Sequence, residues 1–332
     1  MPINWSRFCD IINSHQRFVL TSHIRPDCDS LGSELGMAGV LDQLGKEVLI
    51  VNGHPTPPNL AFVDPDLRIQ VLGEGITVDE VSAAADVLMI LDTSSWAQLG
   101  PMSEVVRATP AVTIVFDHHV KGDDLGAIEF KNTHAEATGR LVAEAAEQLG
   151  VPLTPEIAAS LFAAIATDTG WFRFSSTTAD TYHWAAKLIE AGAVPAAIYA
   201  DLYERDTLGR TRLRGRILER FATELDGRLT HTYVRAADFA ETGALPSDTE
   251  DVINSGLAIT GTEVAVILVE QIDGGSKISF RSRCDLDCSD LAAQFGGGGH
   301  KAAAGAFVEG DFAAAQKKIL AAVRQAMGPG PS

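Results

Sequence analysis

Histidine and aspartate side chains follow short apolar runs at three places in the first half of the chain. They are His23, Asp27, Asp29, Asp92, Asp117, His118 and His119. Each residue alone could be a turn former or a helix cap. Three apolar runs that are each followed by aspartate or histidine are, however, poorly explained by chance. Because parallel strands end at one edge of a sheet and ligands bind there, the sequence predicts that these side chains meet in one site.

A further aspartate, Asp168, follows the apolar stretch of a helix predicted over residues 155–167. The negative end of the helix dipole disfavours an anion at this position. A bound cation would remove that conflict, and the alternative is an exposed carboxylate screened by water. We therefore add Asp168 to the candidate site.

Six of these residues provide two imidazoles and four carboxylates, enough to bind two cations that share one carboxylate. The six are His23, Asp27, Asp29, Asp92, His118 and Asp168. Mixed nitrogen and oxygen ligands without thiolate favour Mn²⁺, with Mg²⁺ or Co²⁺ as substitutes. Two such ions ~3.5 to 4 Å apart can hold a bridging hydroxide and neutralise the charge of an in-line displacement at phosphorus. The predicted chemistry is phosphoester hydrolysis.

A second group of candidate residues lies near the C-terminus, where two arginines precede a glycine run. The group comprises Arg281, Ser282, Arg283, Gly297, Gly298, Gly299 and His300. Successive glycines let backbone N–H groups approach an anion, and arginines give forked donors to phosphate. The run is no Walker loop, because alanine follows Lys301. A flexible linker is the alternative, but the flanking histidine and small residues favour phosphate binding.

The composition argues against several classes of protein. No apolar run approaches the ~20 residues that cross a bilayer, and the N-terminus shows no secretory signal, so we expect a cytoplasmic protein without a membrane segment. Four cysteines are too few for a disulfide framework, and the spacing of Cys284 and Cys288 is wrong for a zinc site. The net charge is −18, and residues 1–206 carry 12 Lys and Arg against 28 Asp and Glu, which opposes binding of long nucleic acid.

The apolar pattern predicts an α/β protein of two domains. Residues 1–206 are expected to form a mostly parallel sheet flanked by helices, with strands at 18–22, 47–51, 87–91 and 112–116 and helices at 30–44, 138–149, 155–167 and through 178–204. A linker at 207–226, helical over 208–225, leads to a smaller α+β domain at 227–328. There we expect strands at 229–234, 263–270 and 277–283, a hairpin turn at 273–275 and helices at 289–295 and 312–327.

The motifs together resemble those of the DHH phosphoesterases that carry a DHH-associated C-terminal domain. The segments SHIRPDCDS, LDTSS, FDHH, ATDTGWFRFS, FRS and FGGGGHKAAAG follow the order of the family motifs and span residues 17–326. The chain is most similar to the bacterial bifunctional nanoRNase (oligoribonuclease) and pAp phosphatase group. The resemblance therefore implies the DHH-type fold for the first domain.

The resemblance also implies a role for each candidate residue. One Mn²⁺ would be held by His23, Asp27 and Asp92, and the other by Asp29, Asp92, His118 and Asp168. Asp117 would lie behind the ligands and orient them, and His119 would contact the scissile phosphate. The C-terminal domain would close over the cleft, where Arg281 and the Gly297 to His300 loop would grip the distal nucleotide or a terminal phosphate. Cys28 stands where the family usually has glycine or alanine.

By this resemblance we expect an enzyme that releases 5′-mononucleotides from short oligoribonucleotides and dephosphorylates adenosine 3′,5′-bisphosphate (pAp). Hydrolysis of cyclic di-AMP or of a linear dinucleotide is an alternative activity, and the sequence does not distinguish between the two activities. A manganese pyrophosphatase would carry a basic Ser-Arg-Lys-Lys-Gln run, which this sequence lacks. A non-catalytic nucleotide-binding module would be expected to have lost a ligand. The oligomeric state stays open, with a homodimer among the options.

Overall fold

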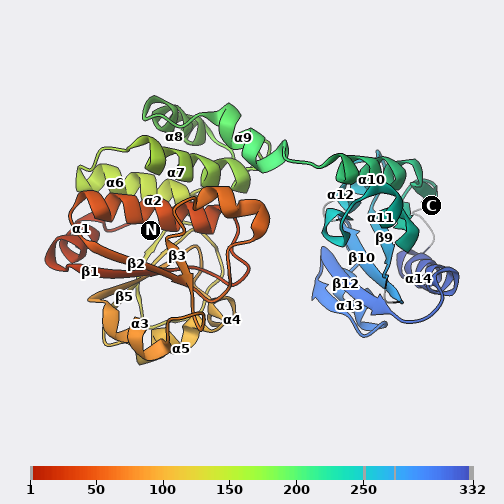
Figure 1. Cartoon of the computed structure of the whole chain (residues 1–332), viewed down its shortest axis with the longest axis horizontal. Helices are drawn as coiled ribbons and strands as arrows, with labels where there is room; N and C mark the ends of the chain where they lie inside the picture. The colour runs from red at the N-terminus through yellow and green to blue at the C-terminus, as the bar shows by residue number, and fades with distance from the viewer. Residues whose placement is uncertain (1–2, 250–251, 273, 329–332) are drawn as a thin grey trace. The chain divides into compact units, whose positions relative to one another are not determined.

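The computed structural model describes residues 3–249, 252–272 and 274–328. The chain divides into two compact units, Met1–Arg205 and Asp206–Ser332 (Figure 1), and each is described by itself below. Asp273, part of the predicted hairpin turn, lies outside the described residues, whereas Gly274 and Gly275 both have positive φ. None of the helices in the described ranges combines the length and apolar character that a membrane span needs.

A six-stranded parallel sheet forms the centre of the N-terminal unit, in the order β3-β2-β1-β4-β5-β6. Its strands are β1 (Arg17–Thr21), β2 (Glu47–Asn52), β3 (Ile69–Val71), β4 (Val87–Leu91), β5 (Val112–Asp117) and β6 (Ile128–Lys131). The apolar run of β4 is buried along its whole length, which is typical of a parallel sheet covered on both faces. The two short edge strands, β3 and β6, were not predicted.

Helices cover both faces of this sheet (Figure 1). One core contains residues of α1 (Trp5–Ser14), α2 (Cys28–Gln43), α6 (Thr138–Leu149), α7 (Pro155–Asp168), α8 (Ala179–Glu190) and α9 (Pro195–Tyr203). The other contains residues of α3 (Val78–Ala84), α4 (Trp96–Leu99) and α5 (Met102–Ala108). Successive strand residues alternate between the two cores, as a pleated strand requires: Phe18 and Leu20 face the first and Val19 the second. A 3₁₀ turn, η1, spans Pro58–Val63.

Glycines allow α2 to pack closely against α7. A Cβ atom at Gly32 would lie 2.4 Å from the carbonyl oxygen of Ser160, and one at Gly36 would lie 2.4 Å from a methyl carbon of Leu161. The two helix axes can approach this closely only because glycine has no side chain. The contact matters for the site, because the first turn of α2 carries Asp29 and the last residue of α7 is Asp168.

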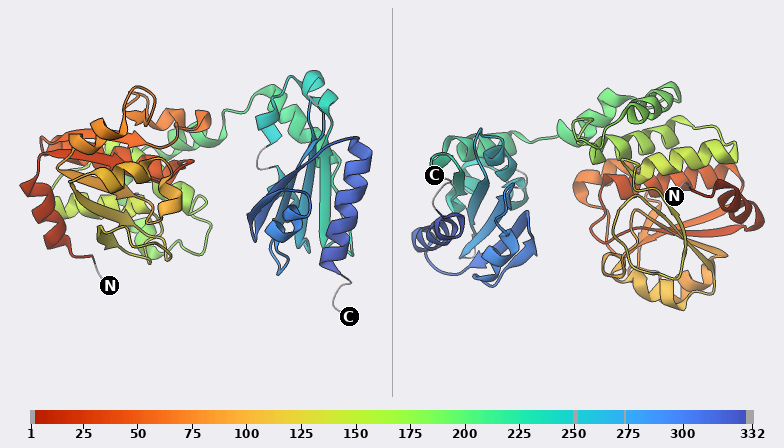
Figure 2. Two further views of the ribbon diagram at one scale, coloured as in Figure 1. Left: turned by 90° about the horizontal axis from the view of Figure 1, so that it is seen from below. Right: turned by 180° about the vertical axis from the view of Figure 1, so that it is seen from behind.

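The C-terminal unit contains a second six-stranded sheet, of mixed direction, in the order β11-β12-β10-β9-β8-β7. Its strands are β7 (Ala222–Glu224), β8 (Leu229–Val234), β9 (Val264–Glu270), β10 (Ser276–Ser282), β11 (Gly298–His300) and β12 (Ala303–Val308), of which only β8 and β9 pair in parallel. One face packs on α13 (Cys288–Ala293) and α14 (Phe312–Met327), and Figure 2 shows α14 running along the sheet. The other face packs on α10 (Leu208–Glu219), α11 (Ala236–Thr242) and α12 (Ile253–Leu257). A 3₁₀ turn, η2, spans Pro246–Thr249.

Two predicted helices need correction. The linker helix over 208–225 is too long, because α10 ends at Glu219 and Ala222–Glu224 forms β7, which pairs with β8 across a turn where Leu225 and Asp226 have positive φ. Pairing with a strand outweighs the local helical pattern there. The helical stretch through 178–204 is interrupted between α8 and α9, where Gly192 has φ +115° and Pro195 starts the next helix.

Candidate metal centre

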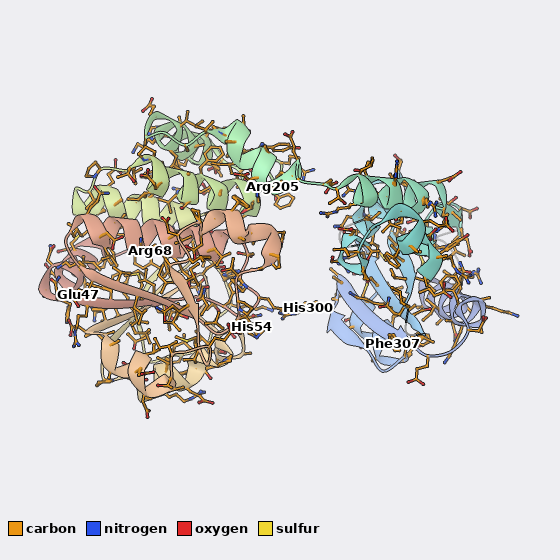
Figure 3. The ribbon with its side chains drawn as sticks, viewed as in Figure 1. Glu47, His54, Arg68, Arg205, His300 and Phe307 are labelled. Carbon is orange, nitrogen blue, oxygen red and sulfur yellow. The ribbon has the colours of Figure 1, made fainter. Side chains whose placement is uncertain are left out.

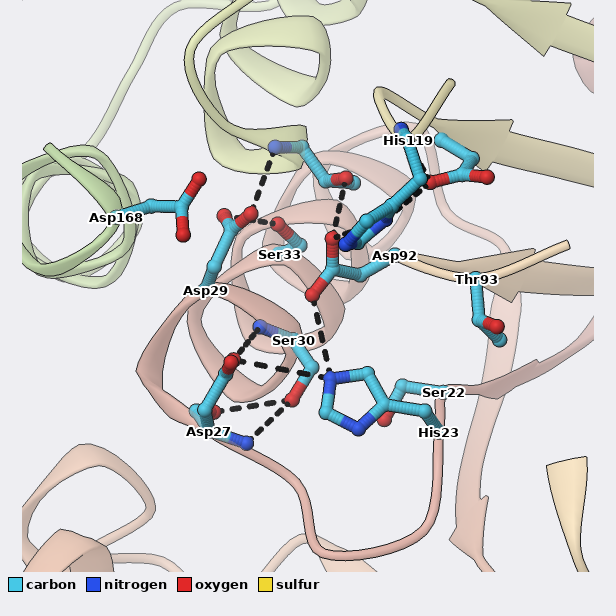
Figure 4. A network of polar contacts seen from close by, with 12 residues as sticks. Ser22, His23, Asp27, Asp29, Ser30, Ser33, Asp92, Thr93, His119 and Asp168 are labelled. Carbon is cyan, nitrogen blue, oxygen red and sulfur yellow. Dashed lines mark hydrogen bonds and ion pairs between the residues drawn. The ribbon is translucent and has the colours of Figure 1, made fainter. Parts of the chain in front are cut away.

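The acidic and imidazole side chains predicted to meet lie together at the carboxyl edge of the parallel sheet (Figure 4). The segments after β1, β4 and β5 supply His23, Asp92, His118 and His119, two helix ends supply Asp27, Asp29 and Asp168, and Asp117 is the last residue of β5. This is the edge at which ligands bind in open α/β sheets. The local sequence pattern predicts that each residue lies at the end of a strand or helix, and the parallel sheet brings these ends together.

Asp92 lies between two imidazoles. Its Oδ2 is 3.3 Å from Nε2 of His23, and its Oδ1 is 3.5 Å from Nε2 of His118. Its backbone is left-handed, with φ +62°, a conformation that needs support from its surroundings. Thr138 provides part of that support, since its hydroxyl donates to Oδ1 of Asp92 at 2.8 Å. The two carboxylate oxygens thus face different halves of the site.

Each half of the site is completed by further carboxylates. On one side, Nε2 of His23 lies 3.8 Å from Oδ1 of Asp27. On the other, Nε2 of His118 lies 3.8 Å from Oδ2 of Asp29 and 3.6 Å from Oδ2 of Asp168. Within each of these two groups the ligand atoms lie within 4.8 Å of one another, as they do in a third group of Asp92, His118 and His119.

Backbone carbonyls hold the two central imidazoles in one orientation. Nδ1 of His23 lies 2.9 Å from the carbonyl oxygen of Ile24, and Nδ1 of His118 lies 3.2 Å from that of Ala135. With the Nδ1 proton donated to a carbonyl, Nε2 carries the free lone pair that faces the carboxylates. This arrangement fixes the tautomer in the way usual for metal-binding histidines.

The carboxylates of Asp29 and Asp92 are buried close to each other, which is unfavourable unless a cation is present, while Asp27 is exposed and Asp168 is half-buried. Burial raises the pKa of Asp29 and of Asp92, and the neighbouring Asp27 raises both further. Burial and the charge of Asp29 together raise the pKa of Asp168 to about 6. A divalent cation would neutralise these carboxylates, and mixed imidazole and carboxylate donors suit such a cation. The residues present therefore fit a metal centre.

Asp117 is fully buried and turns its carboxylate away from these ligands, towards four donors. Oδ1 accepts from the backbone N–H of His119 at 3.0 Å and lies 2.8 Å from Nδ1 of the same residue. Oδ2 accepts from Oγ of Ser94 at 2.7 Å and lies 3.0 Å from Nζ of Lys131. Burial acts to raise the pKa of Asp117, but these donors hold it well below its usual range. Asp117 is thus a charged support for His119.

Cys28, which stands between Asp27 and Asp29, is not part of any ligand group among the described residues. Its thiol is buried in the hydrophobic core next to Thr167. Burial raises the pKa of the thiol to about 12, so the sulfur stays protonated and is a poor metal ligand at neutral pH.

A pocket of about 550 Å³ opens beside the candidate metal centre. It is lined by His23, Asp27, Asp92, Thr93, Ser94, Ser95, Gln98, His118, His119, Val120, Lys121 and Asp168. Sequence reasoning singled out neither the polar residues that follow Asp92 nor Lys121. The segment LDTSS, which contains Ser94 and Ser95, was the only signal for them.

The candidate phosphate-binding residues near the C-terminus lie on neighbouring strands. Arg281 of β10 and His300 of β11 both pair with Ala303 of β12, one from each side, so their side chains lie on the same face of the sheet. His300 projects outward from its edge strand (Figure 3). Ser282 is buried and interacts with Cys284, and Arg283 donates to the carbonyl oxygen of Leu257.

The glycine run needs correction, because it forms an edge strand rather than an open loop. Gly298 and Gly299 pair with β12, and a Cβ at Gly297 or Gly299 would lie 2.1 or 2.6 Å from a carbonyl oxygen of that strand. Gly299 also has φ +147°. Close strand pairing therefore explains these two glycines, while Gly298 is exposed with open space around its Cα.

The fold and the site define an α/β protein with a candidate centre for divalent metals at the carboxyl edge of a parallel sheet, followed by a second domain with a mixed sheet. The chain belongs to the DHH family. Residues 17–165 match the DHH family, N-terminal domain, and residues 226–328 match the DHHA1 domain.

Named relatives align over most of the chain. The bifunctional oligoribonuclease and PAP phosphatase NrnA of Thermus thermophilus is 31% identical over 312 residues, which cover 92% of this chain and 89% of the relative. The protein of the same name from Bacillus subtilis is 25% identical over 300 residues, with coverage of 90% and 91%. A solved structure, an exopolyphosphatase-related protein from Bacteroides fragilis, superposes with a TM-score of 0.84 at 26% identity and covers 97% of this chain and 95% of its own.

Proposed function

We propose that this chain is a metal-dependent phosphoesterase that hydrolyses short oligoribonucleotides to 5′-mononucleotides and dephosphorylates pAp. The observation that carries the proposal is the position of Asp92, whose two carboxylate oxygens face two separate groups of imidazole and carboxylate ligands. A relative named for both activities, 31% identical over 92% of this chain, supports the choice of substrates.

The metals in this proposal are two Mn²⁺ ions, with Mg²⁺ or Co²⁺ as substitutes. His23, Asp27 and Asp92 would hold one ion, and Asp29, Asp92, His118 and Asp168 the other. When bound, the ions neutralise negative charge at the phosphoryl group and activate water for in-line displacement. The groups of ligand atoms within 4.8 Å of one another support this division.

The remaining side chains of the site orient the ligands and the substrate. Thr138 fixes the Asp92 carboxylate through its hydroxyl. His119 has 55% of its side chain exposed beside the pocket, and Asp117 holds its Nδ1. Asp117 leaves Nε2 of His119 free to contact a non-bridging oxygen of the scissile phosphate, to which it donates when the ring carries both protons. His118, His119, Asp92 and Asp117 form the catalytic set, in which Asp117 acts through His119.

We assign catalysis to the domain at residues 1–206 and recognition of the distal end of the substrate to the domain at 227–328. Residues 207–226, expected as a linker, form α10 and β7 and pack within the second unit. The residues proposed to bind a terminal phosphate or distal nucleotide are Arg281, Ser282, Arg283, Gly297, Gly298, Gly299 and His300. The common face of Arg281 and His300 supports this assignment, since an anion can be bound by both.

Charge and cysteine chemistry support a cytoplasmic enzyme with short substrates. All four cysteines are free thiols, which suits a reducing compartment. The net charge of −18 opposes the phosphate contacts on which binding of long nucleic acid depends. Short substrates with few phosphates are less affected.

Product chromatography tests the proposed activity. The protein and its Asp92→Ala variant are incubated with Mn²⁺ or a chelator and with pApA, longer oligoribonucleotides, pAp, cyclic di-AMP or pyrophosphate. We expect metal-dependent release of AMP from pApA and pAp, lost in Asp92→Ala. An Asp10→Ala variant is the matched control, because Asp10 is an exposed carboxylate on α1, and it should keep full activity.

Each other outcome points to a different function. A preference for cyclic di-AMP would make the protein a cyclic dinucleotide phosphodiesterase, and hydrolysis of pyrophosphate alone would make it a pyrophosphatase. If a manganese-loaded protein hydrolyses none of these compounds, the catalytic assignment fails and a nucleotide-binding module is the better description.

A further inference from the structure

We propose that Lys131 is a positioning residue of the active site, which acts with Ser94 to hold the Asp117 carboxylate and, through it, the ring of His119. The inference depends on the proposed function in one respect, which is the role of His119 in catalysis. Lys131 lies on β6, an edge strand that the sequence pattern did not predict.

Strand register brings the lysine to the site. β5 and β6 pair in parallel with Asp117 opposite Lys131, so the two side chains leave the same end of the sheet side by side. Nζ of Lys131 lies 3.0 Å from Oδ2 of Asp117 and 2.6 Å from Oγ of Ser94. Ser94 in turn donates to Oδ2 at 2.7 Å. The three side chains form a closed triangle of hydrogen bonds.

Burial makes this contact important. The Asp117 side chain has no exposed surface and that of Lys131 is 15% exposed. Asp117 keeps its negative charge in this setting only because charged and polar donors surround it. Lys131 is the only side chain within salt-bridge distance of Asp117, among the described residues, that carries a permanent positive charge. Removal of the Lys131 amine leaves the buried Asp117 carboxylate without a positive charge to neutralise it.

The loop after β5 packs closely against this triangle at Gly122, where a side chain would not fit. A Cβ at Gly122 would lie 2.1 Å from Oγ of Ser94 and 3.0 Å from Nζ of Lys131. The same loop is fastened to the chain after β4, since the backbone N–H of Asp123 donates to the carbonyl oxygen of Ser94 at 2.6 Å. Asp123 also accepts from the backbone N–H of Trp96 at 2.8 Å. These contacts fix the backbone at Ser94, whose hydroxyl accepts from Lys131.

The consequence for catalysis follows from the other oxygen of the carboxylate. Oδ1 of Asp117 accepts from the backbone N–H of His119 and lies 2.8 Å from its Nδ1. If Lys131 and Ser94 fix Oδ2, the carboxylate cannot rotate, Oδ1 stays directed at Nδ1, and the ring of His119 is held with Nε2 available to the substrate. Without Lys131, the carboxylate loses an anchor and the orientation of the His119 ring is no longer fixed.

Two measurements separate this role from a purely structural ion pair. The first is the steady-state kinetics of Lys131→Met, Lys131→Arg and Ser94→Ala on pApA. The second is the ¹H NMR signal of the hydrogen-bonded Nδ1 proton of His119 in metal-free protein, assigned by its loss in His119→Gln. Lys46→Met is the matched control, since Lys46 is a half-buried lysine whose Nζ donates to the carbonyl oxygen of His15.

We expect Lys131→Met to lower kcat by about 10- to 100-fold, the loss typical for the outer partner of a residue at a metal site, with little change in KM or manganese content. The Nδ1 proton signal should weaken or shift in the same variant. Lys131→Arg should recover the signal and most of kcat, because it restores a charged donor. Ser94→Ala should have a smaller effect of the same kind, and Lys46→Met should have none.

A folded Lys131→Met protein with unchanged kcat and an unchanged Nδ1 signal would overturn the inference. So would a loss of activity explained entirely by lost manganese, since Lys131 would then act on the metals and not on His119. If the wild-type protein hydrolyses no substrate, the proposed function fails, but the NMR comparison still tests whether Lys131 fixes the ring.

Discussion

Asp29 caps a helix to which it does not belong: from the first turn of α2, its Oδ2 accepts the backbone N–H of Thr138 at 2.8 Å. Its Oδ1 accepts the next N–H, that of Gly139, at 2.9 Å. These are the first two N–H groups of α6, and the residue before them, Ala137, has no capping side chain. A proposed metal ligand thus also stabilises the N-terminus of a neighbouring helix.

Substitutions of Asp29 should therefore separate metal binding from stability. We expect Asp29→Ala and Asp29→Asn both to lose hydrolysis and manganese binding. In metal-free protein, Asp29→Ala should have a free energy of unfolding about 1 to 2 kcal/mol below that of Asp29→Asn, because alanine leaves both buried N–H groups without an acceptor and the amide oxygen of asparagine still accepts from one of them. Urea denaturation of the chelated variants, followed by tryptophan fluorescence, measures this difference. Equal stability of the two variants would contradict the capping role.

The contact between α2 and α7 leads to a second prediction. Gly32→Ala adds a Cβ that would lie 2.4 Å from the carbonyl oxygen of Ser160, so the helices must move apart and Asp29 must move away from Asp168. We expect a loss of about 1 to 3 kcal/mol in the free energy of unfolding, together with weaker manganese binding measured by isothermal titration calorimetry.

Gly215 provides the matched control for that substitution. It lies within α10, and a Cβ there would meet nothing within 4 Å. Gly215→Ala should therefore raise the free energy of unfolding by up to about 1 kcal/mol, through helix propensity, and should leave manganese binding unchanged. A Gly32→Ala protein that behaves like Gly215→Ala would show that close packing of α2 on α7 is not needed.

The C-terminal unit should lose stability in acid through Asp238. Burial acts to raise the pKa of this carboxyl, but donation from Arg220, from the backbone of Arg235 and from Arg216 lowers it to about 2. That value is below the ~3.9 of an unfolded aspartate, so the charged carboxylate stabilises the folded state above about pH 4. This contribution is lost as the pH falls towards 2.

Hydrogen exchange of the amides in α11 and β8 measures that effect. The wild-type protein should lose protection there as the pH is lowered through this window, after correction for intrinsic exchange. Asp238→Asn should show lower protection at neutral pH and a flatter dependence on pH. Asp290→Asn, at an exposed position of α13, should follow the wild type, and a steep pH dependence retained by Asp238→Asn would argue against this assignment.

The meeting of the proposed metal ligands at one edge of the sheet could be predicted from the sequence, because most of them follow apolar runs that are easy to recognise. Asp92 directly follows VLMIL, and the rules of parallel sheets then place it at the edge where ligands bind. This prediction did not require any contact between residues far apart in the sequence. The same is true of His23 and His118, whose positions depend on the ends of single strands.

The supporting contacts could not be predicted, because they depend on register between segments far apart in the chain. Lys131 reaches Asp117 only through the pairing of β6 with β5, and Asp29 caps a helix that begins 109 residues later. The glycines at 297 and 299 look like part of an open loop until their close approach to β12 is known. Neither residue type nor local spacing contains that information.

Removal of metal should lower the thermal stability of the N-terminal unit. Cations that bind only the folded state stabilise it by mass action, by about 2.7 kcal/mol when the free ion is at 100 times its Kd. Asp92 is 2% exposed and faces both ligand groups, so Asp92→Asn should abolish most of the gain. We expect manganese to raise the Tm of the chelated wild type in calorimetry, and to raise that of Asp92→Asn much less.

The metal-free forms of the same two proteins test the physical reason. Without cations, the wild type keeps the buried carboxylates of Asp29 and Asp92 near those of Asp27 and Asp168. Asp92→Asn has one negative charge fewer there and keeps an oxygen that can accept from Thr138. Metal-free Asp92→Asn should therefore be at least as stable as metal-free wild type. The opposite order, or an equal gain in Tm from manganese in both proteins, would mean that Asp92 is not the carboxylate shared by the two ions.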